Sequence, residues 1–330
     1  MNCDVVMLQE LDKEHFPALR DELSDVYEGR VKHPSHSWTN AIFYRKSKFK
    51  YEFDDSRGAR TFALALRRVD SKKEEPVLVF VNVHLEGNPS KAQVRIRQLE
   101  KQFRRLRSRH NVEPGMVRMV VAGDFNSQLR DATGVFARQG RIDSKGKKAF
   151  DGKTVVRTES KHDWRLKSVL RSDCPTPTYM GWRACGDVST ARKRRPIDHI
   201  LYCSRTLDLK EIRYPMTLDT SVLKEFIATG GLPNSTFPSD HVPIAAVLTY
   251  RTIDLSNIPP PKSVKEEEEF LSETQRETLR RLIQDIPKWK ASGRPSTEWI
   301  QMTKAHHKRV RDFSKTHFYT YTHTHTHTSS

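Results

Sequence analysis

Short apolar runs of strand length recur through the first 250 residues and are separated by polar segments. In residues 61–69 the apolar side chains of Phe62, Leu64 and Leu66 occupy alternate positions, as in a strand with one buried face. The polar segment 70–76 separates this run from the next, so we expect the two strands to pair antiparallel. Further strands are predicted at residues 4–8, 37–44, 49–53, 77–84, 119–122, 196–202 and 245–250.

A helical period replaces the strand pattern after residue 91. The apolar residues there recur at three- and four-residue steps, the spacing of an amphipathic helix: Ala92, Ile96, Leu99, Phe103 and Leu106. The predicted outer face carries the basic residues Arg95, Lys101, Arg104, Arg105 and Arg107. Such a stripe is either a solvated face or a contact for an RNA backbone. A shorter helix through residues 16–23 is expected to have Asp12 as its cap.

The apolar pattern stops near residue 255, which is the expected domain boundary. Residues 1–255 are predicted to form one globular domain. Residues 256–315 are predicted to form a linker, which begins with the prolines 259–261, and a helical tail with helices at 272–285 and 296–313. Residues 316–330 are expected to be a disordered low-complexity tail. Because residues 4–8 are already predicted to be buried, we expect this domain to lack its first strand.

The chain has 330 residues and a formal net charge of +17. Most of that excess lies in the predicted domain, since from residue 259 onward 13 Lys and Arg stand against 9 Asp and Glu. A basic domain favours a polyanionic partner such as nucleic acid, with a solvated basic surface as the alternative. The four cysteines show no metal-binding spacing and indicate reduced thiols of an intracellular protein, cytoplasmic or nuclear. No apolar run reaches the length of a membrane span, so no membrane partner is expected.

Polar residues with catalytic potential stand where the predicted strands enter or leave loops. They are Gln9 and Glu10, His84, Asp124 and Asn126, Asp198, and the pair Asp240 and His241. Gly123 is expected to end the strand before Asp124. A carboxylate and a carboxamide two residues apart point the same way on an extended backbone, which suits a phosphate or a metal-bound water. Taken singly, each motif has a structural explanation, because such residues are also common in turns and in cores.

In this order, over residues 4–250, the motifs resemble those of the endonuclease/exonuclease/phosphatase superfamily. The resemblance implies a DNase I-like α/β fold, a four-layer α/β/β/α sandwich of two mixed β-sheets, to which the helical C-terminal tail is added. Segment 223–241, ending in Ser-Asp-His, is most similar to the deadenylase branch of carbon-catabolite-repressor nucleases, nocturnin, angel and 2′,5′-phosphodiesterases. Residues 82–87 and the arginine-rich helix are equally similar to the tyrosyl-DNA phosphodiesterases.

The resemblance also implies a metal site. Glu10 would bind a divalent cation, Mg²⁺ or in its place Mn²⁺, and Asp240 would lie beside it. Asp124 would orient the attacking water and contact a second metal ion. Such a sparse set of carboxylates is chemically reasonable, because Mg²⁺ keeps several of its waters and needs only one or two carboxylate ligands.

Phosphate chemistry is assigned to the remaining residues of the set by the same resemblance. Asn126 and His84 would contact the scissile phosphate. His241, oriented by Asp198, would stabilise the pentavalent transition state or protonate the leaving oxygen. Attack on a phosphodiester accumulates negative charge on oxygen, and fixed donors beside a hard cation offset that charge.

Aromatic and basic residues are mixed in segment 174–195. Aromatic rings beside arginines are typical of single-stranded nucleotide sites, so Trp182 and Arg195 are candidate substrate-binding residues, with a disordered loop as the alternative. The deadenylase branch often has an aromatic residue shortly before the position of Asp198, where this chain has the basic run 191–195. A preference for adenine is therefore not supported, unless Trp182 or Tyr179 supplies the stacking surface.

We therefore expect a Mg²⁺-dependent phosphodiester hydrolase that acts on RNA, as a 3′-to-5′ exoribonuclease of deadenylase type. The alternatives on the same fold are a tyrosyl-DNA phosphodiesterase, a DNA-repair endonuclease or a phosphatase, because a fold does not choose its substrate. The alternative from another class is a catalytically inactive nucleic-acid-binding module. The expected absence of the first strand favours it, since in the family that strand ends in an Asn near the metal.

Overall fold

The structure is a computed structural model of the whole chain. It describes residues 3–32, 38–58, 60–72, 75–114, 116–142, 146–149, 151–157, 161–170, 178–179, 196–213 and 239–251. The chain divides into two units after Leu255, and all described residues belong to the first. The predicted tail helices, Trp182 and Arg195 lie outside the described residues.

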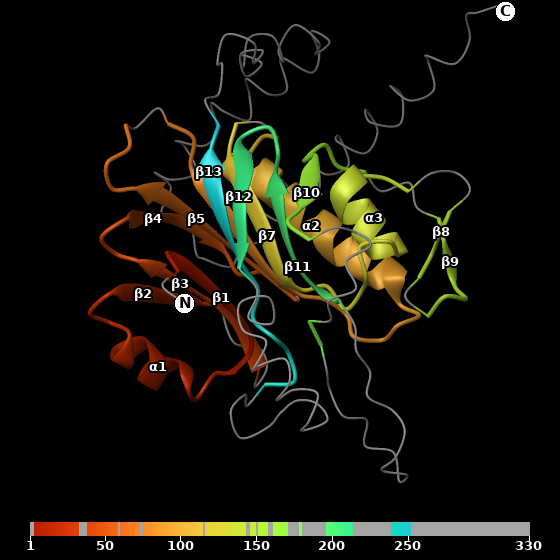
Figure 1. Ribbon diagram of the computed structural model, residues 1–330, viewed down its shortest axis with the longest axis horizontal. Coiled ribbons are helices and arrows are strands. Elements are labelled where there is room, and N and C mark those ends of the chain that lie inside the picture. Colours follow the sequence, from red (N-terminus) through yellow and green to blue (C-terminus); the bar gives the residue numbers. More distant parts are fainter. Residues whose placement is uncertain are drawn as a thin grey trace, which may run out of the picture. The chain divides into compact units, whose positions relative to one another are not determined.

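The largest sheet of the described residues has six strands in the order β10-β11-β7-β6-β5-β4 (Figure 1). Strands β6 and β7 run parallel and the other neighbours pair antiparallel, so the sheet is mixed. The predicted pairing across the polar segment 70–76 is thereby confirmed. The bounds are β4 Phe49–Asp55, β5 Thr61–Arg68, β6 Leu78–His84, β7 Arg118–Asp124, β10 Leu166–Ser168 and β11 Asp198–Cys203.

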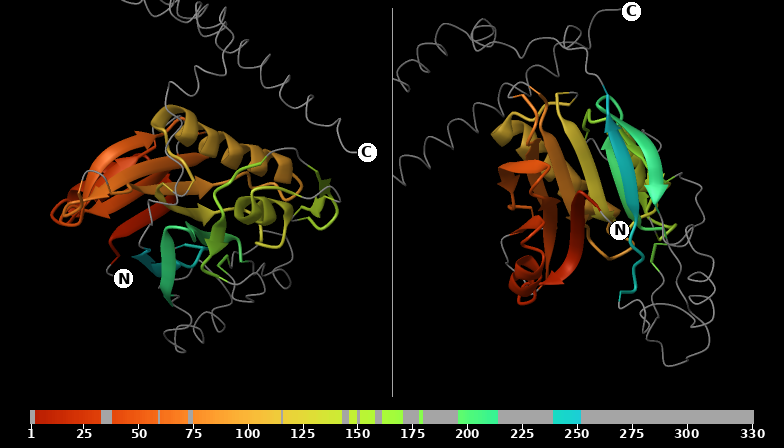
Figure 2. Two further views of the ribbon diagram at one scale, coloured as in Figure 1. Left: turned by 90° about the horizontal axis from the view of Figure 1, so that it is seen from above. Right: turned by 60° about the vertical axis from the view of Figure 1, so that its left-hand side comes forward.

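A second, antiparallel sheet faces the first and has the strand order β1-β3-β2. Its strands are β1 Val5–Asp12, β2 Tyr27–Val31 and β3 Trp38–Arg45. Two further antiparallel pairs complete the described strands. They are β12 Leu207–Arg213 with β13 Ala245–Tyr250, and β8 Lys147–Lys148 with β9 Val155–Val156. Figure 2 shows the layers from two further sides.

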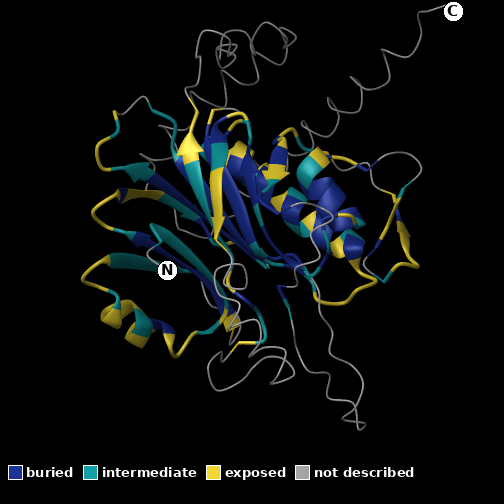
Figure 3. Ribbon diagram, in the orientation of Figure 1, coloured by how far each residue is buried: buried dark blue, intermediate teal, exposed yellow. Residues whose placement is uncertain are grey.

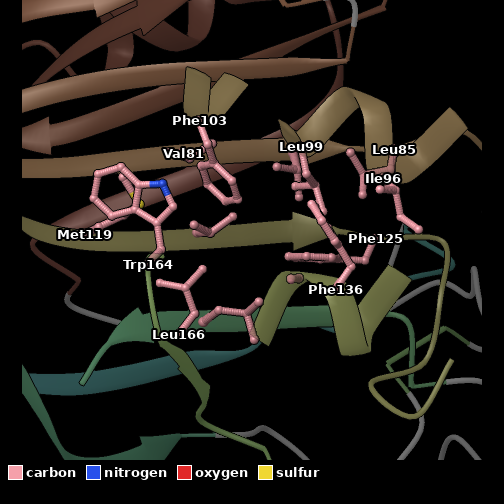
Figure 4. Close-up of a cluster of buried hydrophobic side chains, with 14 of the residues drawn as sticks. Val81, Leu85, Ile96, Leu99, Phe103, Met119, Phe125, Phe136, Trp164 and Leu166 are labelled. Carbon is pink, nitrogen blue, oxygen red and sulfur yellow. The ribbon is translucent and has the colours of Figure 1, made fainter. Parts of the chain in front are cut away.

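Three apolar clusters hold the layers together. Helices α2 (Ala92–His110) and α3 (Ala132–Gln139) cover the outer face of the six-stranded sheet, where Leu99 and Phe136 pack against strand residues (Figure 4). A second cluster, which includes Ile42 and Phe80, fills the space between the two sheets. Helix α1 (Phe16–Glu22) packs its Phe16 on the far face of the three-stranded sheet. This order of layers confirms the predicted α/β/β/α sandwich.

Because β5, β6 and β7 lie in the middle of the sandwich, both of their faces are buried (Figure 3). Strands buried on both sides read as continuous apolar runs, which is the pattern of residues 77–81 and 119–122. The ionisable candidates for catalysis on these strands therefore stand at the strand ends, where a loop and solvent begin. The construction of the sheet thus directs His84, Asp124 and Asp198 to one edge of the molecule.

Three local predictions were wrong. Asp12 is the last residue of β1 and not a helix cap, because the chain makes a turn before α1 starts at Phe16. Gly123 does not end β7, which continues to Asp124. Arg95 is not on the solvent face of α2. Its side chain is fully buried, and its guanidinium donates to the carbonyl oxygens of residues 86, 88 and 89, which satisfies the charge without solvent.

None of the helices in the described part of the chain combines the length and the apolar character that crossing a membrane requires. Cys3 and Cys203 are free thiols, and Cys203 is buried.

Candidate active site

The end of β7 places Asp124 at the centre of the site. Gly123 precedes it with φ of 131°, and a Cβ there would lie 2.1 Å from the carbonyl oxygen of Val83, so only glycine fits this close approach to β6. The carboxylate of Asp124 is buried and accepts hydrogen bonds from the backbone N–H of Asn126 at 2.6 Å and from Asn126 Nδ2 at 3.0 Å. Asp124 is therefore held in one orientation by its own loop.

Asn126 meets Asp124 for a different reason from the predicted one. The two side chains were expected to point the same way on an extended backbone, but Asn126 has φ of 47°, in the left-handed region. Its Nδ2 donates both to Asp124 Oδ2 and to the carbonyl oxygen of Leu85, each at 3.0 Å. Both amide hydrogens are thus used inside the protein, and Asn126 in this geometry positions Asp124.

A second carboxylate and a histidine lie on the neighbouring strand. Asp198 is directly opposite Asp124 in the antiparallel register of β11 and β7. Its Oδ2 lies 2.8 Å from Nδ1 of His241, which the segment before β13 carries to the same edge of the sheet. The ring of Tyr179 packs on the imidazole with centroids 5.0 Å apart. The predicted orientation of His241 by Asp198 is present in the geometry.

The three-stranded sheet supplies Glu10 through an irregularity in β1. The register with β3 shifts between Leu8 and Leu11, and Glu10 itself has φ of 54°. A bulge of this kind turns a side chain away from the regular alternation of the strand. It brings Glu10 Oε1 to 3.3 Å from Nε2 of His84 at the end of β6. The Glu10 side chain remains 62% exposed and is accessible to a ligand.

Asn82 ties this bulge to the six-stranded sheet. Its side chain is fully buried between the sheets, where Nδ2 donates to the carbonyl oxygens of Leu8 and Ala41, each at 2.9 Å. Oδ1 accepts from Gln9 Nε2 at 2.8 Å. Every polar atom of this buried amide is therefore satisfied, and the residues beside Glu10 are fixed to β6.

These contacts join the predicted residues into one site. Nε2 of His84 lies 3.3 Å from Glu10 and 3.9 Å from Oδ2 of Asp124. Asp124 faces Asp198, which is bonded to His241. Side chains separated by as many as 231 positions in the sequence therefore share one edge of the sandwich. Asp240 is half-buried and its charge acts on His241.

The titratable groups of the site differ in the direction and cause of their pKa shifts. Burial, reinforced by the charge of Asp198, raises the pKa of Asp124 to about 7. Burial alone would lower the pKa of His241, but the hydrogen bond and the charge of Asp198 outweigh it and raise this pKa to about 9. Burial lowers the pKa of His84 although Glu10 opposes the shift. Near neutral pH, His241 is thus a cation and a donor, whereas His84 is a neutral imidazole.

The donor set of the site suits some metal ions and not others. No group of three or more His, Cys, Asp or Glu side chains among the described residues converges on a common point. A Zn²⁺ site, which needs three or four protein ligands, does not fit this arrangement. The exposed carboxylate of Glu10 near Asp124 fits a hard cation that keeps most of its waters, as Mg²⁺ does.

Two positioning residues were not found from the sequence. Thr178 Oγ1 accepts hydrogen bonds from the backbone N–H groups of Ile197 and Asp198, at 3.0 and 2.9 Å, and so fixes the start of β11. His199 is buried with Nε2 at 2.8 Å from the carbonyl oxygen of Ser127, and its ring packs on Phe125. In the sequence, the Asp-His dipeptide at 198–199 drew attention to Asp198 alone. Only the fold shows that His199 supports the loop after Asp124.

Comparison with known proteins identifies the family. The model of the Endonuclease/Exonuclease/phosphatase family matches residues 1–241, and the chain belongs to this family. The superfamily resemblance predicted from the motifs is thus confirmed, and with it the class of phosphate-ester hydrolases. Comparison with the curated proteins found no significant match.

Solved structures with the same fold include ANGEL2, described as a 2′,3′-cyclic phosphatase and bound to adenosine-2′,3′-vanadate. It is 20% identical, with a TM-score of 0.52 over 74% of this chain and 81% of that one. The human Nocturnin catalytic domain with bound sulfate is 15% identical, with a TM-score of 0.47 over 75% and 81%. The D. rerio TDP2 complex with a single-stranded DNA product is 17% identical, with a TM-score of 0.46 over 74% and 86%.

Proposed function

We propose that this chain is a Mg²⁺-dependent phosphodiester hydrolase that acts on RNA, as a 3′-to-5′ exonuclease of deadenylase type. The observation that carries the proposal is the hydrogen bond between Asp198 and His241 directly beside Asp124. It places a protonated imidazole, which is a hydrogen-bond donor, beside two carboxylates at one point of the site.

Each residue of the site has a different role in the proposed hydrolysis. Asp124, once ionised, orients the attacking water and accepts its proton. His241, protonated and held by Asp198 through Nδ1, donates from Nε2 to the phosphoryl or leaving oxygen. Neutral His84 donates a hydrogen bond to a phosphate oxygen. Mg²⁺ bound near Glu10 would supply positive charge that offsets the charge developing on the phosphate.

The assignment to RNA is supported by two lines of argument. The net charge of +17, most of it before residue 259, favours a polyanion. The run of residues 223–241 into Ser-Asp-His resembles the deadenylase branch, and ANGEL2, described as a 2′,3′-cyclic phosphatase, shares the fold. An RNA that ends in a 2′,3′-cyclic phosphate is therefore one of the substrates to be tested.

The test is a substrate panel with the full-length chain, assayed with Mg²⁺, with Mn²⁺ and with EDTA. The substrates are 5′-labelled poly(A), mixed RNA, RNA ending in a 2′,3′-cyclic phosphate, abasic DNA and 5′-tyrosyl DNA. We expect a ladder of RNA products that shorten from the 3′ end and that disappear in EDTA. Preference for either DNA substrate would remove the RNA assignment, and RNA binding without turnover would indicate an inactive binding module.

A matched pair of variants links turnover to the site. Asp124→Asn should reduce turnover by roughly 10³-fold or more, since it removes the group that orients and deprotonates the water. Asp21→Asn makes the same change at an exposed carboxylate on α1 and should leave turnover unchanged. Equal activity of the two variants would show that Asp124 does not take part in the reaction.

A further inference from the structure

Helix α2 does not present the whole basic face that its sequence predicts. Of the five basic residues expected there, Arg95 is buried. Arg105 and Arg107 each form an ion pair at 3.0 Å with a carboxylate from outside the helix. Lys101 and Arg104 are exposed, and neither forms an ion pair with a carboxylate of the described residues. Two cations of the predicted set therefore remain without an opposite charge.

Arg97 joins these two cations on the surface of the helix. Its side chain is exposed as well, and it forms no ion pair within the described part of the chain. Residues 97, 101 and 104 are four and three positions apart, so they lie on one face of the helix, over about 10 Å of its length. We call Arg97, Lys101 and Arg104 the α2 stripe.

The charges of the α2 stripe have one sign and lie close together. Cations three and four positions apart on a helix repel one another, whereas a solvated helix face usually carries both signs, so that such pairs attract. Over its whole length, α2 contains seven Lys and Arg residues and one acidic residue, Glu100. Such a face is unfavourable for the helix by itself and favourable for contact with a polyanion.

The start of α2 is fixed to the edge of the sandwich that carries the active site. Strand β6 ends there with His84, and the next residues lead directly into the helix. The guanidinium of Arg95 donates to the carbonyl oxygens of residues 86, 88 and 89, and Asn126 Nδ2 donates to that of Leu85. Because β6 and β7 are parallel, α2 runs from this edge toward the opposite one (Figure 2).

We propose that the α2 stripe binds the sugar–phosphate backbone of RNA that extends beyond the active site. The stripe lies in the part of the helix that leaves the site edge, so an RNA whose end is held in the site can continue along it. Phosphate oxygens accept charge-assisted hydrogen bonds from arginine and lysine, and such contacts do not depend on base sequence. The preferred partner is then a long single-stranded RNA. This inference rests on the proposed function, which supplies the RNA.

The main test is RNA binding in EDTA, which separates affinity from turnover. The stripe variant carries Arg97→Gln, Lys101→Gln and Arg104→Gln, and glutamine keeps the helix propensity of these residues. The affinity for a fluorescent 20-nucleotide RNA, about that length, is measured by anisotropy over a range of salt concentrations. Loss of three phosphate contacts should reduce the slope of log K against log salt by about 2, at about 0.7 for each contact with a single strand. An unchanged slope would overturn the inference.

A control variant removes the same amount of charge from the opposite edge of the sandwich. It carries Lys46→Gln, Lys50→Gln and Lys72→Gln, at exposed positions on β4 and on the turns before β4 and after β5. Both variants lose three positive charges, so an effect of net charge alone would weaken RNA binding equally. We expect the control to keep the slope of the wild type. Equal reductions in the two variants would show that the α2 stripe is not a specific surface.

Turnover of RNAs of two lengths gives an independent measure. With Mg²⁺, the stripe variant should raise KM for the long RNA by about 10-fold or more, because contacts outside the site are lost. For a trinucleotide, kcat/KM should stay within about 2-fold of the wild-type value, since so short an RNA held in the site does not extend along α2. Equal losses on the two RNAs would place the effect in the active site and overturn the inference.

An acidic polypeptide is the other polyanion that a basic helix face can bind. A fluorescent polyglutamate peptide is therefore titrated in the same binding assay. Loss of its affinity in the stripe variant, with RNA binding unchanged, would assign the surface to an acidic protein and overturn the inference. If the wild-type chain hydrolyses no RNA, the proposed function fails, whereas binding in EDTA still decides whether the α2 stripe contacts RNA.

Discussion

The two sheets contribute unlike halves to the site. On the six-stranded sheet, Asp124 and Asp198 are buried, bonded by neighbouring groups and oriented before any ligand arrives. On the three-stranded sheet, Glu10 stands on a bulge, with a positive φ and a largely exposed side chain. The first half is preorganised, which is what proton transfer and charge stabilisation require. The second half presents a carboxylate to solvent, which suits a cation that keeps its waters.

The difference teaches how a sandwich can build one site from two kinds of support. Parallel and antiparallel neighbours in the middle of a sheet fix a side chain through the register of the ladder. A side chain on a bulge near a sheet edge depends on hydrogen bonds from outside its own strand. Here the main group that holds the bulge is the side chain of Asn82. Variants in the first half should therefore change chemistry, whereas variants in the second half should change metal dependence and stability.

The largest effect is expected from the buried half. Asp198→Asn keeps the shape of the residue but removes the charge that raises the pKa of His241. We expect kcat to fall by roughly 10²- to 10⁴-fold, because His241 loses both its orientation and its proton near neutral pH. The pH–rate profile should show the decline on the alkaline side moving toward neutrality. A profile unchanged in shape would contradict the pairing of Asp198 with His241.

A smaller and different effect is expected from the exposed half. Glu10→Gln should reduce activity at low Mg²⁺, and the loss should be partly recovered at high Mg²⁺, since a hydrated cation retains its other contacts. The measurement is activity as a function of Mg²⁺ concentration, for the variant and for Glu14→Gln as an exposed control on the turn before α1. A Mg²⁺ requirement equal to that of the wild type would exclude Glu10 as the metal-binding carboxylate.

The anchor between the halves should be tested by Asn82→Leu, which keeps the approximate volume and removes the hydrogen bonds. We expect a loss of about 1–3 kcal/mol in the free energy of unfolding, because the carbonyl oxygens of Leu8 and Ala41 are left without their donor. Denaturant unfolding measures this loss. Activity should fall as well, and high Mg²⁺ should not restore it, in contrast to Glu10→Gln. Recovery by Mg²⁺ would mean that Asn82 does not hold the bulge.

The smallest effect is a pH dependence of stability without metal. His241 has a raised pKa in the folded chain, so unfolding releases its proton between pH 6.5 and about 9. Its stabilising contribution is complete below pH 6.5 and is lost as the pH rises through 9, by on the order of 1–3 kcal/mol. The raised pKa of Asp124 acts below about pH 7, so the range from 7.5 to 9.5 isolates His241.

The measurement is the denaturation midpoint in EDTA at pH 7.5 and 9.5. His241→Gln should remove most of the difference that the wild type shows between these two pH values. His15→Gln, at an exposed position before α1, should keep that difference. A wild type whose midpoint does not change in this range would contradict the ion pair with Asp198.

Much of the fold was predictable because its physical causes are local. The apolar alternation of residues 61–69 and the period of residues 92–106 gave β5 and α2 nearly to their observed ends. Arg95 was assigned to the wrong face of α2 because the helical spacing of apolar residues treats every arginine as a surface residue. Its burial depends on three carbonyl oxygens of the loop after β6, and these converge only in the folded chain.

The sequence by itself determined the strands, the long helix, the family and the set of residues at the strand ends, because burial of apolar side chains and their periodicity act over a few neighbours. Only the tertiary structure decided how that set works. The register of β11 with β7 placed Asp198 opposite Asp124, and the bulge anchored by Asn82 turned Glu10 toward His84. The hydrogen bonds from Asn82 to Leu8 and Ala41 likewise follow from two sheets meeting face to face, which is a long-range contact that no local pattern records.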